Sequence, residues 1–169
     1  MGFTGGVMRK LVPALVVLVC AAGCAAQFPA DPDGTLDRVT GGVLRAGISP
    51  SPPWTVLAAG TEDPTGAEVD LVEDFAESID AEVVWTPGGE EELMTQLERS
   101  ELDLVVGGLT ATSPWTSHAA LTYPYTTTTG PDGTQEKRVM AAPLGENAFL
   151  VALESFLLSP PTVVEDGAP

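Results

Sequence analysis

Apolar and polar positions alternate from residue 43 onward in a way that predicts successive strands and helices. Val43 to Ser49 is a compact, largely apolar run, which predicts a buried strand. Ala67 to Ile79 carries apolar residues on one face and acids on the other, which predicts a helix. Ala81 to Thr86 predicts a second strand, and Pro87 to Gly89 ends it. This succession indicates the start of an α/β domain.

The same alternation continues through a second helix and a third strand. The acids Glu90 to Glu92 favour a helix start through the helix dipole, and Leu93 and Leu97 give that helix an apolar stripe. Leu102 to Gly108 is almost wholly apolar apart from Asp103, as expected of a parallel strand covered on both faces. Three strands joined by two helices predict parallel pairing with right-handed crossovers.

The rest of the chain has a different pattern. Thr122 to Thr128 and Lys137 to Ala142 are β-prone runs around the turn Gly130 to Gly133, which predicts an antiparallel hairpin. Glu146 to Leu158 has apolar residues at helical spacing and predicts a closing helix. The predicted fold class is therefore α/β, a single three-layer lobe with a mainly parallel sheet plus an antiparallel hairpin.

The first 24 residues have the features of an export signal. Arg9 and Lys10 form a basic start, and Leu11 to Val19 is a short apolar run. Small residues then precede Cys24, an ending that resembles a bacterial lipobox and would make Cys24 the lipidated first residue of the mature protein. Ordinary secretory cleavage between Ala22 and Ala26, with Cys24 incidental, is the alternative.

These patterns divide the chain into four predicted parts. Residues 1–24 form a lipoprotein signal peptide, and residues 25–41, rich in small residues, proline and glycine, form a flexible tether. Residues 42–158 form the single lobe, and residues 159–169 form a disordered tail.

Charge and cysteine content restrict the function further. All 24 acidic residues follow Cys24 but only five basic ones do, so the exported part has a formal charge of about −19. Such a charge excludes nucleic acid as a partner and repels anionic lipids, which leaves membrane attachment to the anchor. Both cysteines, Cys20 and Cys24, lie in the signal region, so the domain itself has no disulfide.

Several motifs together resemble a known family. The chain contains Gly42 to Gly47 followed by Pro52-Pro53-Trp54, then Gly66 to Leu71, Leu102 to Thr112 and Tyr123-Pro124-Tyr125. In this order they resemble lobe one of family 3 of the bacterial extracellular solute-binding proteins, the polar amino acid type. The resemblance implies a type II periplasmic binding protein fold and a small ligand held between two lobes.

The chain departs from that family in two ways. Only Thr126 to Glu136 separates Tyr125 from Lys137 to Ala142, which resembles the strand that returns from lobe two, so the second lobe is predicted to be absent. The family commonly has an arginine three residues after the second threonine, where it grips a carboxylate, and this chain has Trp115 three residues after Thr112. Indole offers one donor and no charge.

The candidate site residues have alternative roles. Thr110 and Thr112 would form an anion-binding helix start, or Thr112 or Ser113 would only cap a short helix. Trp54 and Trp115 would form an aromatic platform at the edge of the sheet, or would cover the core. The candidate ligand-binding residues are Trp54, Glu68, Thr110, Thr112 and Trp115.

No catalytic pattern accompanies these residues. The sequence has no nucleophile elbow, phosphate loop or metal-ligand spacing, and His118 stands alone, so we predict no enzyme activity, no cofactor and no metal. The sequence favours a lipid-anchored protein on the outer face of a bacterial membrane that binds a small ligand for transport or sensing. Its expected partners are that ligand and ABC transporter membrane components or another membrane protein. The alternative is a ligand-free interaction or regulatory module.

Overall fold

The main sheet has five strands and mixed direction. The computed structural model describes residues 29–57, 63–130 and 133–159. The strand order is β2 (Glu82–Pro87), β1 (Val43–Ile48), β3 (Leu104–Val106), β7 (Ala141–Ala142) and β4 (Ala120–Leu121). β1 pairs in parallel with both β2 and β3, whereas β7 is antiparallel to β3 and to β4. The predicted parallel pairing of the first three strands is confirmed.

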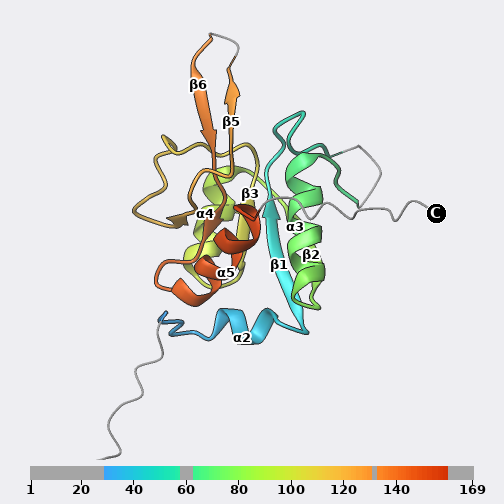
Figure 1. Ribbon diagram of the computed structural model, residues 1–169, viewed down its shortest axis with the longest axis vertical. Coiled ribbons are helices and arrows are strands. Elements are labelled where there is room, and N and C mark those ends of the chain that lie inside the picture. Colours follow the sequence, from blue (N-terminus) through green and yellow to red (C-terminus); the bar gives the residue numbers. More distant parts are fainter. Residues whose placement is uncertain (1–28, 58–62, 131–132, 160–169) are drawn as a thin grey trace, which may run out of the picture.

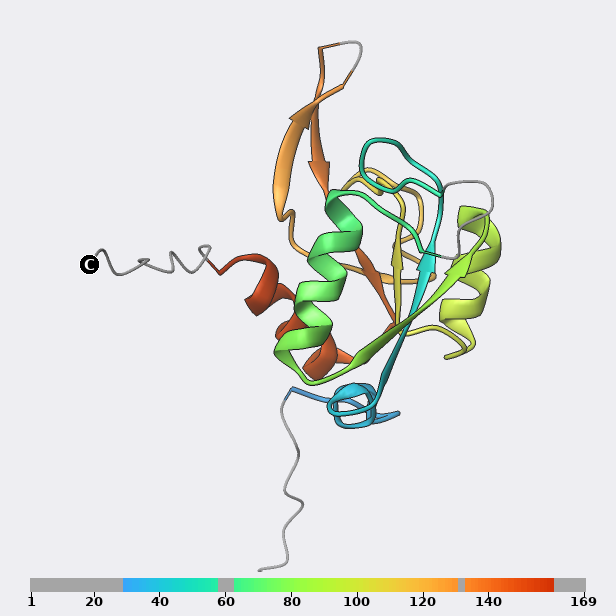
Figure 2. The same cartoon turned by 90° about the vertical axis from the view of Figure 1, so that its right-hand side faces the viewer.

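Helices cover both faces of this sheet and complete three layers. α3 (Ala67–Ser78) and α5 (Asn147–Leu157) lie on one face and α4 (Glu90–Glu98) lies on the other, as Figure 2 shows. Phe75 of α3 meets Phe149 of α5 edge to face, with ring centroids 5.9 Å apart. Each such fully buried side chain contributes roughly 1.5–3 kcal/mol of burial energy. The three-layer α/β lobe is the predicted fold.

The predicted hairpin exists, but it forms a separate arm. β5 (Thr126–Thr129) and β6 (Gln135–Arg138) pair antiparallel from Thr126↔Arg138 to Thr129↔Gln135. The arm projects beyond the lobe in Figure 1. The sequence pattern predicts one long returning strand from Lys137 to Ala142, and this is wrong in detail. The chain leaves β6 at Val139, whose amide donates to the Leu109 carbonyl at 3.1 Å, and then enters the main sheet as β7.

Part of the predicted tether is folded instead. α2 (Thr35–Val39) lies within residues 25–41, at the end of the lobe opposite the arm (Figure 1). The Glu146 carboxylate accepts bonds of 3.0 Å from the amides of Asp33 and Thr35, and Val39 is completely buried. The prediction of a flexible tether is therefore wrong for this stretch, because a residue more than a hundred positions away caps the helix.

A second carboxylate completes this contact. Asp31 accepts a bond from the Leu36 amide at 2.8 Å and one from the Phe149 amide at 3.4 Å, while the Ala30 carbonyl accepts from the amides of Asn147 and Ala148. Burial raises the pKa of Asp31. We call this contact the N-terminal latch: residues 30–36 together with the first turn of α5 and Glu146. It joins the beginning of the domain to its last helix.

Asp103 joins the same end of the lobe to the sheet. Its side chain is completely buried and accepts from the Arg45 amide at 2.9 Å and from the guanidinium groups of Arg38 and Arg45, each at 2.6 Å in its shortest bond. Burial alone would raise the pKa of Asp103, but the hydrogen bonds from Arg45 and Arg38 outweigh it and lower that pKa. This explains the polar residue in an otherwise apolar strand.

Several predictions fall outside the described residues. The signal peptide, Cys24 and residues 160–169 of the tail belong to this group. Within the ranges that the structure does describe, we find no helix with the length and hydropathy needed to cross a bilayer.

Candidate functional site

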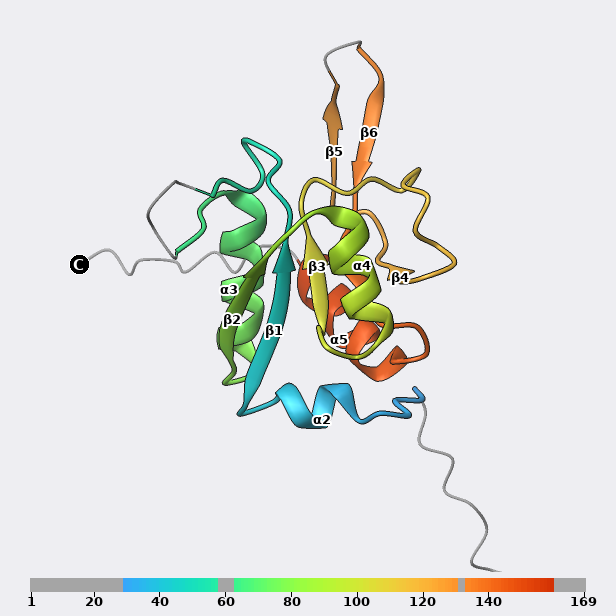
Figure 3. The ribbon, with the colours of Figure 1, turned by 180° about the vertical axis from the view of Figure 1, so that it is seen from behind.

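Most of the candidate residues lie near the carboxyl ends of β1 and β3. Ser49 to Thr55 follows β1, and Gly107 to Thr112 follows β3. The base of the β5–β6 arm lies beside them, because the Ala111 amide donates to the Lys137 carbonyl at 2.9 Å. Figure 3 shows these loops and the arm at the same end of the lobe. We call this region the carboxyl edge. Open α/β sheets bind ligands at such edges.

Glu68 lies under the turn that follows β3. Its side chain is 0% exposed, and one carboxylate oxygen accepts bonds from the amides of Gly107 at 3.0 Å and Gly108 at 2.8 Å. The other oxygen accepts from the Tyr125 hydroxyl at 2.6 Å. Burial and the charge of Glu68 raise the pKa of Tyr125, so the phenol stays protonated and keeps donating. The carboxylate is thus fully used inside the protein.

This arrangement fixes the shape of the edge. Gly108 has a φ of 70°, and a Cβ there would lie 2.1 Å from the Ser51 hydroxyl oxygen, so a glycine is required. Glu68 holds the amides of this turn in place. The prediction that Glu68 contacts a ligand does not fit its burial. Glu68 lies at the predicted edge, but it positions the turn and does not face outward.

Arg138 is the residue at this edge that the sequence interpretation missed. Its guanidinium carbon lies 4.8 Å from the centroid of the Trp54 ring, and its Nη1 donates to the Gly108 carbonyl at 2.6 Å. Nε donates to the Thr128 hydroxyl at 3.2 Å, and Nη2 pairs with the Glu136 carboxylate at 2.5 Å. Only 11% of the Arg138 side chain is exposed. The one available signal was the basic pair Lys137-Arg138 in a strongly acidic chain.

Thr110 and Thr112 are brought together at the surface of the edge. Their hydroxyl oxygens lie 2.9 Å apart, and the Thr110 amide donates to the Ser113 hydroxyl at 3.0 Å. Both sequence interpretations assumed that a helix begins here, and this is wrong. The amides of His118 and Ala119 both donate to the Trp115 carbonyl, which produces turns in place of a helix. The Ser113 hydroxyl therefore belongs to a turn and caps no helix.

The two tryptophans have different surroundings. Trp54 lies against the Arg138 guanidinium, whereas the Trp115 indole donates to the Glu90 carboxylate at 3.0 Å and packs beside the α4 core. His118 meets Trp115 edge to face at 6.2 Å. The structure therefore supports core covering for Trp115, and it leaves the aromatic face at the edge to Trp54.

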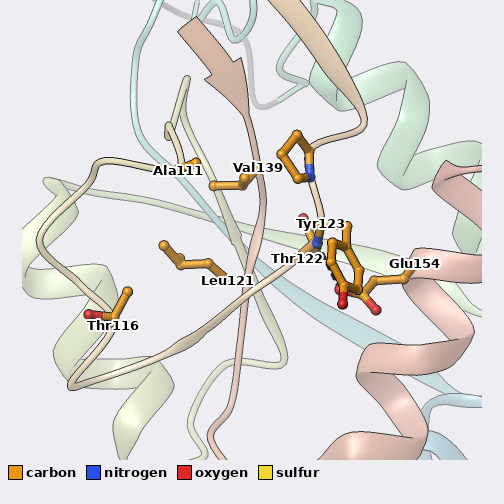
Figure 4. A pocket seen from close by; sticks show the side chains of 8 residues that line it. Ala111, Thr116, Leu121, Thr122, Tyr123, Val139 and Glu154 are labelled. Atoms are coloured by element: carbon orange, nitrogen blue, oxygen red, sulfur yellow. Dashed lines mark hydrogen bonds between the residues drawn. The ribbon is translucent and has the colours of Figure 1, made fainter.

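Two hollows adjoin these residues. The first, which we call the edge groove, runs between the turn after β3 and β6 and is lined by Thr110, Ala111, Thr112, Thr134, Gln135, Glu136 and Lys137. The second is more apolar and lies on the flank, where Figure 4 shows Tyr123 and Glu154 together on one side and Thr116 on the other. The Glu154 carboxylate accepts from the Tyr123 amide at 2.7 Å. Only the edge groove contains predicted site residues.

Comparison with models of known protein families shows to which family the chain belongs. The family model described as bacterial extracellular solute-binding proteins, family 3, matches residues 44–137, which is more than half of the chain. The chain belongs to this family. The match includes the loops of the carboxyl edge and the arm as far as Lys137. A comparison with curated proteins finds no match.

Solved structures agree on the fold of this family 3 chain. The arginine-bound domain 1 of TmArgBP, as its Phe57Trp mutant, is 22% identical over 72% of this chain and 95% of that one, with a TM-score of 0.63. The ancestral amino acid-binding protein AncCDT-1, a precursor of cyclohexadienyl dehydratase, is 16% identical over 73% and 91%, with a TM-score of 0.63. An arginine-specific periplasmic binding protein of Salmonella typhimurium is 12% identical over 68% and 91%, with a TM-score of 0.59. These neighbours are mainly binding proteins, and the fold shared with them is lobe one.

Proposed function

We propose that this protein binds a small, amino-acid-like ligand at the carboxyl edge of its single lobe. The observation that carries the proposal is the edge groove, which begins at a turn held rigid by the buried Glu68 and presents the hydroxyls of Thr110 and Thr112. A rigid, preformed edge lowers the entropic cost of binding. Membership of family 3 supports a ligand of the amino acid class.

The absence of a second lobe does not prevent such binding. One structural neighbour is described as the arginine-bound form of domain 1, so a single lobe of this fold has been observed with a ligand. Family 3 chains are extracytoplasmic by description. We extend this to a lipid anchor at Cys24 on the outer face of a bacterial membrane, and to delivery of the ligand to ABC transporter membrane components or another membrane protein.

Thermal unfolding of the chain from Ala25 onward, with and without pooled amino acids, amines, sugars and organic acids, tests ligand binding. A ligand at about a hundred times its dissociation constant adds roughly 2.7 kcal/mol of stability. This should raise the midpoint by at least several degrees, at roughly 2–8 °C per kcal/mol. A cooperatively folded sample that no pool stabilises would refute the proposal.

Two variants locate the site once a pool is active. Thr112→Ala removes one hydroxyl of the groove and should weaken binding, by about 0.5–1.5 kcal/mol for one hydrogen bond. Trp115→Arg restores the family's usual residue and should strengthen binding of carboxylate-bearing ligands. Thr95→Ala, at an exposed position on α4, is the matched control for Thr112→Ala and should leave the ligand-induced shift unchanged.

The anchor requires its own experiment. Cys24→Ala should release the protein from membranes, and mass spectrometry of the native form should find lipid on Cys24. Cys20→Ala is the control, because it removes the other cysteine of the signal region. A Cys24→Ala protein that stays in the membrane fraction would contradict lipid anchoring.

A ligand-free interaction module is the second candidate. It is favoured by Trp115 in place of the family's arginine and by apolar side chains at the surface, such as Tyr123 at 68% and Leu144 at 53% exposure. This candidate expects self-association or a stable partner, since exposed apolar patches mark interaction sites. Sedimentation that finds a monomer at all concentrations, with ligand stabilisation present, would exclude it.

A further inference from the structure

The basic residues of this chain are few and unevenly distributed. Only five follow Cys24, and two of these, Arg38 and Arg45, pair with Asp103 at the far end of the lobe. Lys137 and Arg138 stand together at the carboxyl edge, and Lys137 lines the edge groove. A protein with a strong negative charge thus keeps two of its cations beside the edge groove.

The Arg138 guanidinium is largely buried, so it requires a negatively charged partner. A guanidinium that is largely buried is costly unless a carboxylate compensates it. Trp54 covers its face, and the Gly108 carbonyl and Thr128 hydroxyl take two of its donors, but neither carries a charge. Within the described residues, Arg138 forms its ion pair with Glu136.

Glu136 is a replaceable partner. Its side chain is 31% exposed, it lies on the projecting arm two residues before Arg138, and it forms part of the wall of the edge groove. A rotation of its side chain would take the carboxylate into water while Arg138 stays in place. A ligand carboxylate that reaches this side of the arm could then take the place of Glu136 on the same guanidinium. Arg138 keeps one carboxylate partner before and after the exchange.

We propose that Arg138 is a carboxylate-binding group at the carboxyl edge, and that Glu136 occupies the binding position until the carboxylate of a ligand displaces it. The proposal rests on the proposed function for its ligand, which it narrows to small molecules with a free carboxylate. Arg138 thereby supplies, from β6, the charge that Trp115 does not supply. Glu136 sets the affinity, because any ligand has to compete with a carboxylate at a high effective concentration.

Nuclear magnetic resonance of the Arg138 Nε–H group in the chain from Ala25 onward tests this exchange. The probes are acetate, acetamide and methylammonium, at constant ionic strength. Acetate should shift the Arg138 resonance in a saturable way, and Glu136→Gln should lower the acetate dissociation constant by about tenfold, because the competing charge is gone. Acetamide should have no effect. Glu101→Gln removes the same charge from an exposed position before β3 and should leave the constant unchanged.

Three outcomes decide between the ideas. Equal acetate affinity in the native protein, Glu136→Gln and Glu101→Gln would overturn the proposal, and so would a response to methylammonium in place of acetate. If pooled ligands stabilise the protein while Glu136→Gln changes nothing, the proposed function stands and the exchange is wrong. If acetate binds more tightly to Glu136→Gln while no pool stabilises the native protein, the exchange is supported and the proposed function fails.

Discussion

The two ends of the sheet each bury a carboxylate, but they do so with different partners. At the amino end of β3, Asp103 is surrounded by the guanidinium groups of Arg38 and Arg45. At the carboxyl edge, Glu68 is held by two amides and the Tyr125 hydroxyl, which carry no net charge. The first arrangement uses the available cations for stability. The second shapes a turn with neutral donors and does not use Arg138, which pairs with Glu136.

Asp103→Asn should have the largest effect on this comparison. It leaves two guanidinium groups without their carboxylate, and breaking a buried ion pair costs about 3–5 kcal/mol. We expect the lower part of this range because the Arg38 and Arg45 side chains are 42% and 33% exposed. Chemical denaturation should measure the loss. Asp37→Asn, an exposed acid of α2, is the control. Equal stability of the two variants would contradict the importance of the Asp103 cluster.

The same cluster predicts a pH dependence. The pKa of Asp103 in the folded state is lowered from an ordinary value of 3.8, so its stabilisation is complete above that value and is lost as the pH falls through the lowered pKa. The difference in unfolding free energy between the native protein and Asp103→Asn should therefore be constant from pH 7 to about pH 5 and should shrink below about pH 4. If this difference in unfolding free energy increased as the pH falls, the prediction would be wrong.

Glu68→Gln should have an intermediate effect at the other end. A glutamine amide places a donor against the Gly107 and Gly108 amides or the Tyr125 hydroxyl, and one unsatisfied buried group costs about 1–3 kcal/mol. Hydrogen exchange at the amides of Gly107 and Gly108 should accelerate. Glu73→Gln on the exposed face of α3 should leave both readouts unchanged. Protected glycine amides in Glu68→Gln would show that the turn does not depend on the carboxylate.

His118→Ala should have the smallest effect. His118 and Glu98 lie 3.2 Å apart, and each side chain is about half exposed, at 47% and 54%. Exposed pairs of this kind contribute about 0–1 kcal/mol. The free energy of unfolding of His118→Ala, measured by urea denaturation, should match that of Ser117→Ala within about 0.5 kcal/mol. A larger loss would place His118 among the residues that shape the edge, contrary to its exposure.

The sequence pattern was sufficient for elements that carry their own signal. The strand and helix periods from Val43 to Val106 predicted β1, α3, β2, α4 and β3 within a few residues, because each buries a face of recognisable spacing. α2 was missed, since its five residues have little helical preference and depend on caps from Asp31 and Glu146. The contact with Glu146, more than a hundred residues away, leaves no local pattern.

The candidate site was predictable only as a region. The family motifs pointed to the carboxyl edge, where Trp54 lies against Arg138, the hydroxyls of Thr110 and Thr112 lie 2.9 Å apart, and Glu68 accepts bonds from the amides of the turn. They did not reveal that the Glu68 carboxylate accepts a hydrogen bond from the half-buried Tyr125 hydroxyl. They also did not reveal Arg138, because its place at the edge depends on the register of β6 against β5. Spacing along a strand cannot show which loop the strand will reach.

The N-terminal latch also determines how the domain would respond to mechanical load. A pull on the chain ahead of Ala30 acts first on the bonds from Asn147 and Ala148 to the Ala30 carbonyl. Beyond them, the Glu146 carboxylate and the pair Arg38–Asp103 pass the tension to α5 and β3 before it reaches β1. Several bonds share the force, so we expect the domain to withstand traction from its N-terminal side while the loops at the carboxyl edge keep their shape.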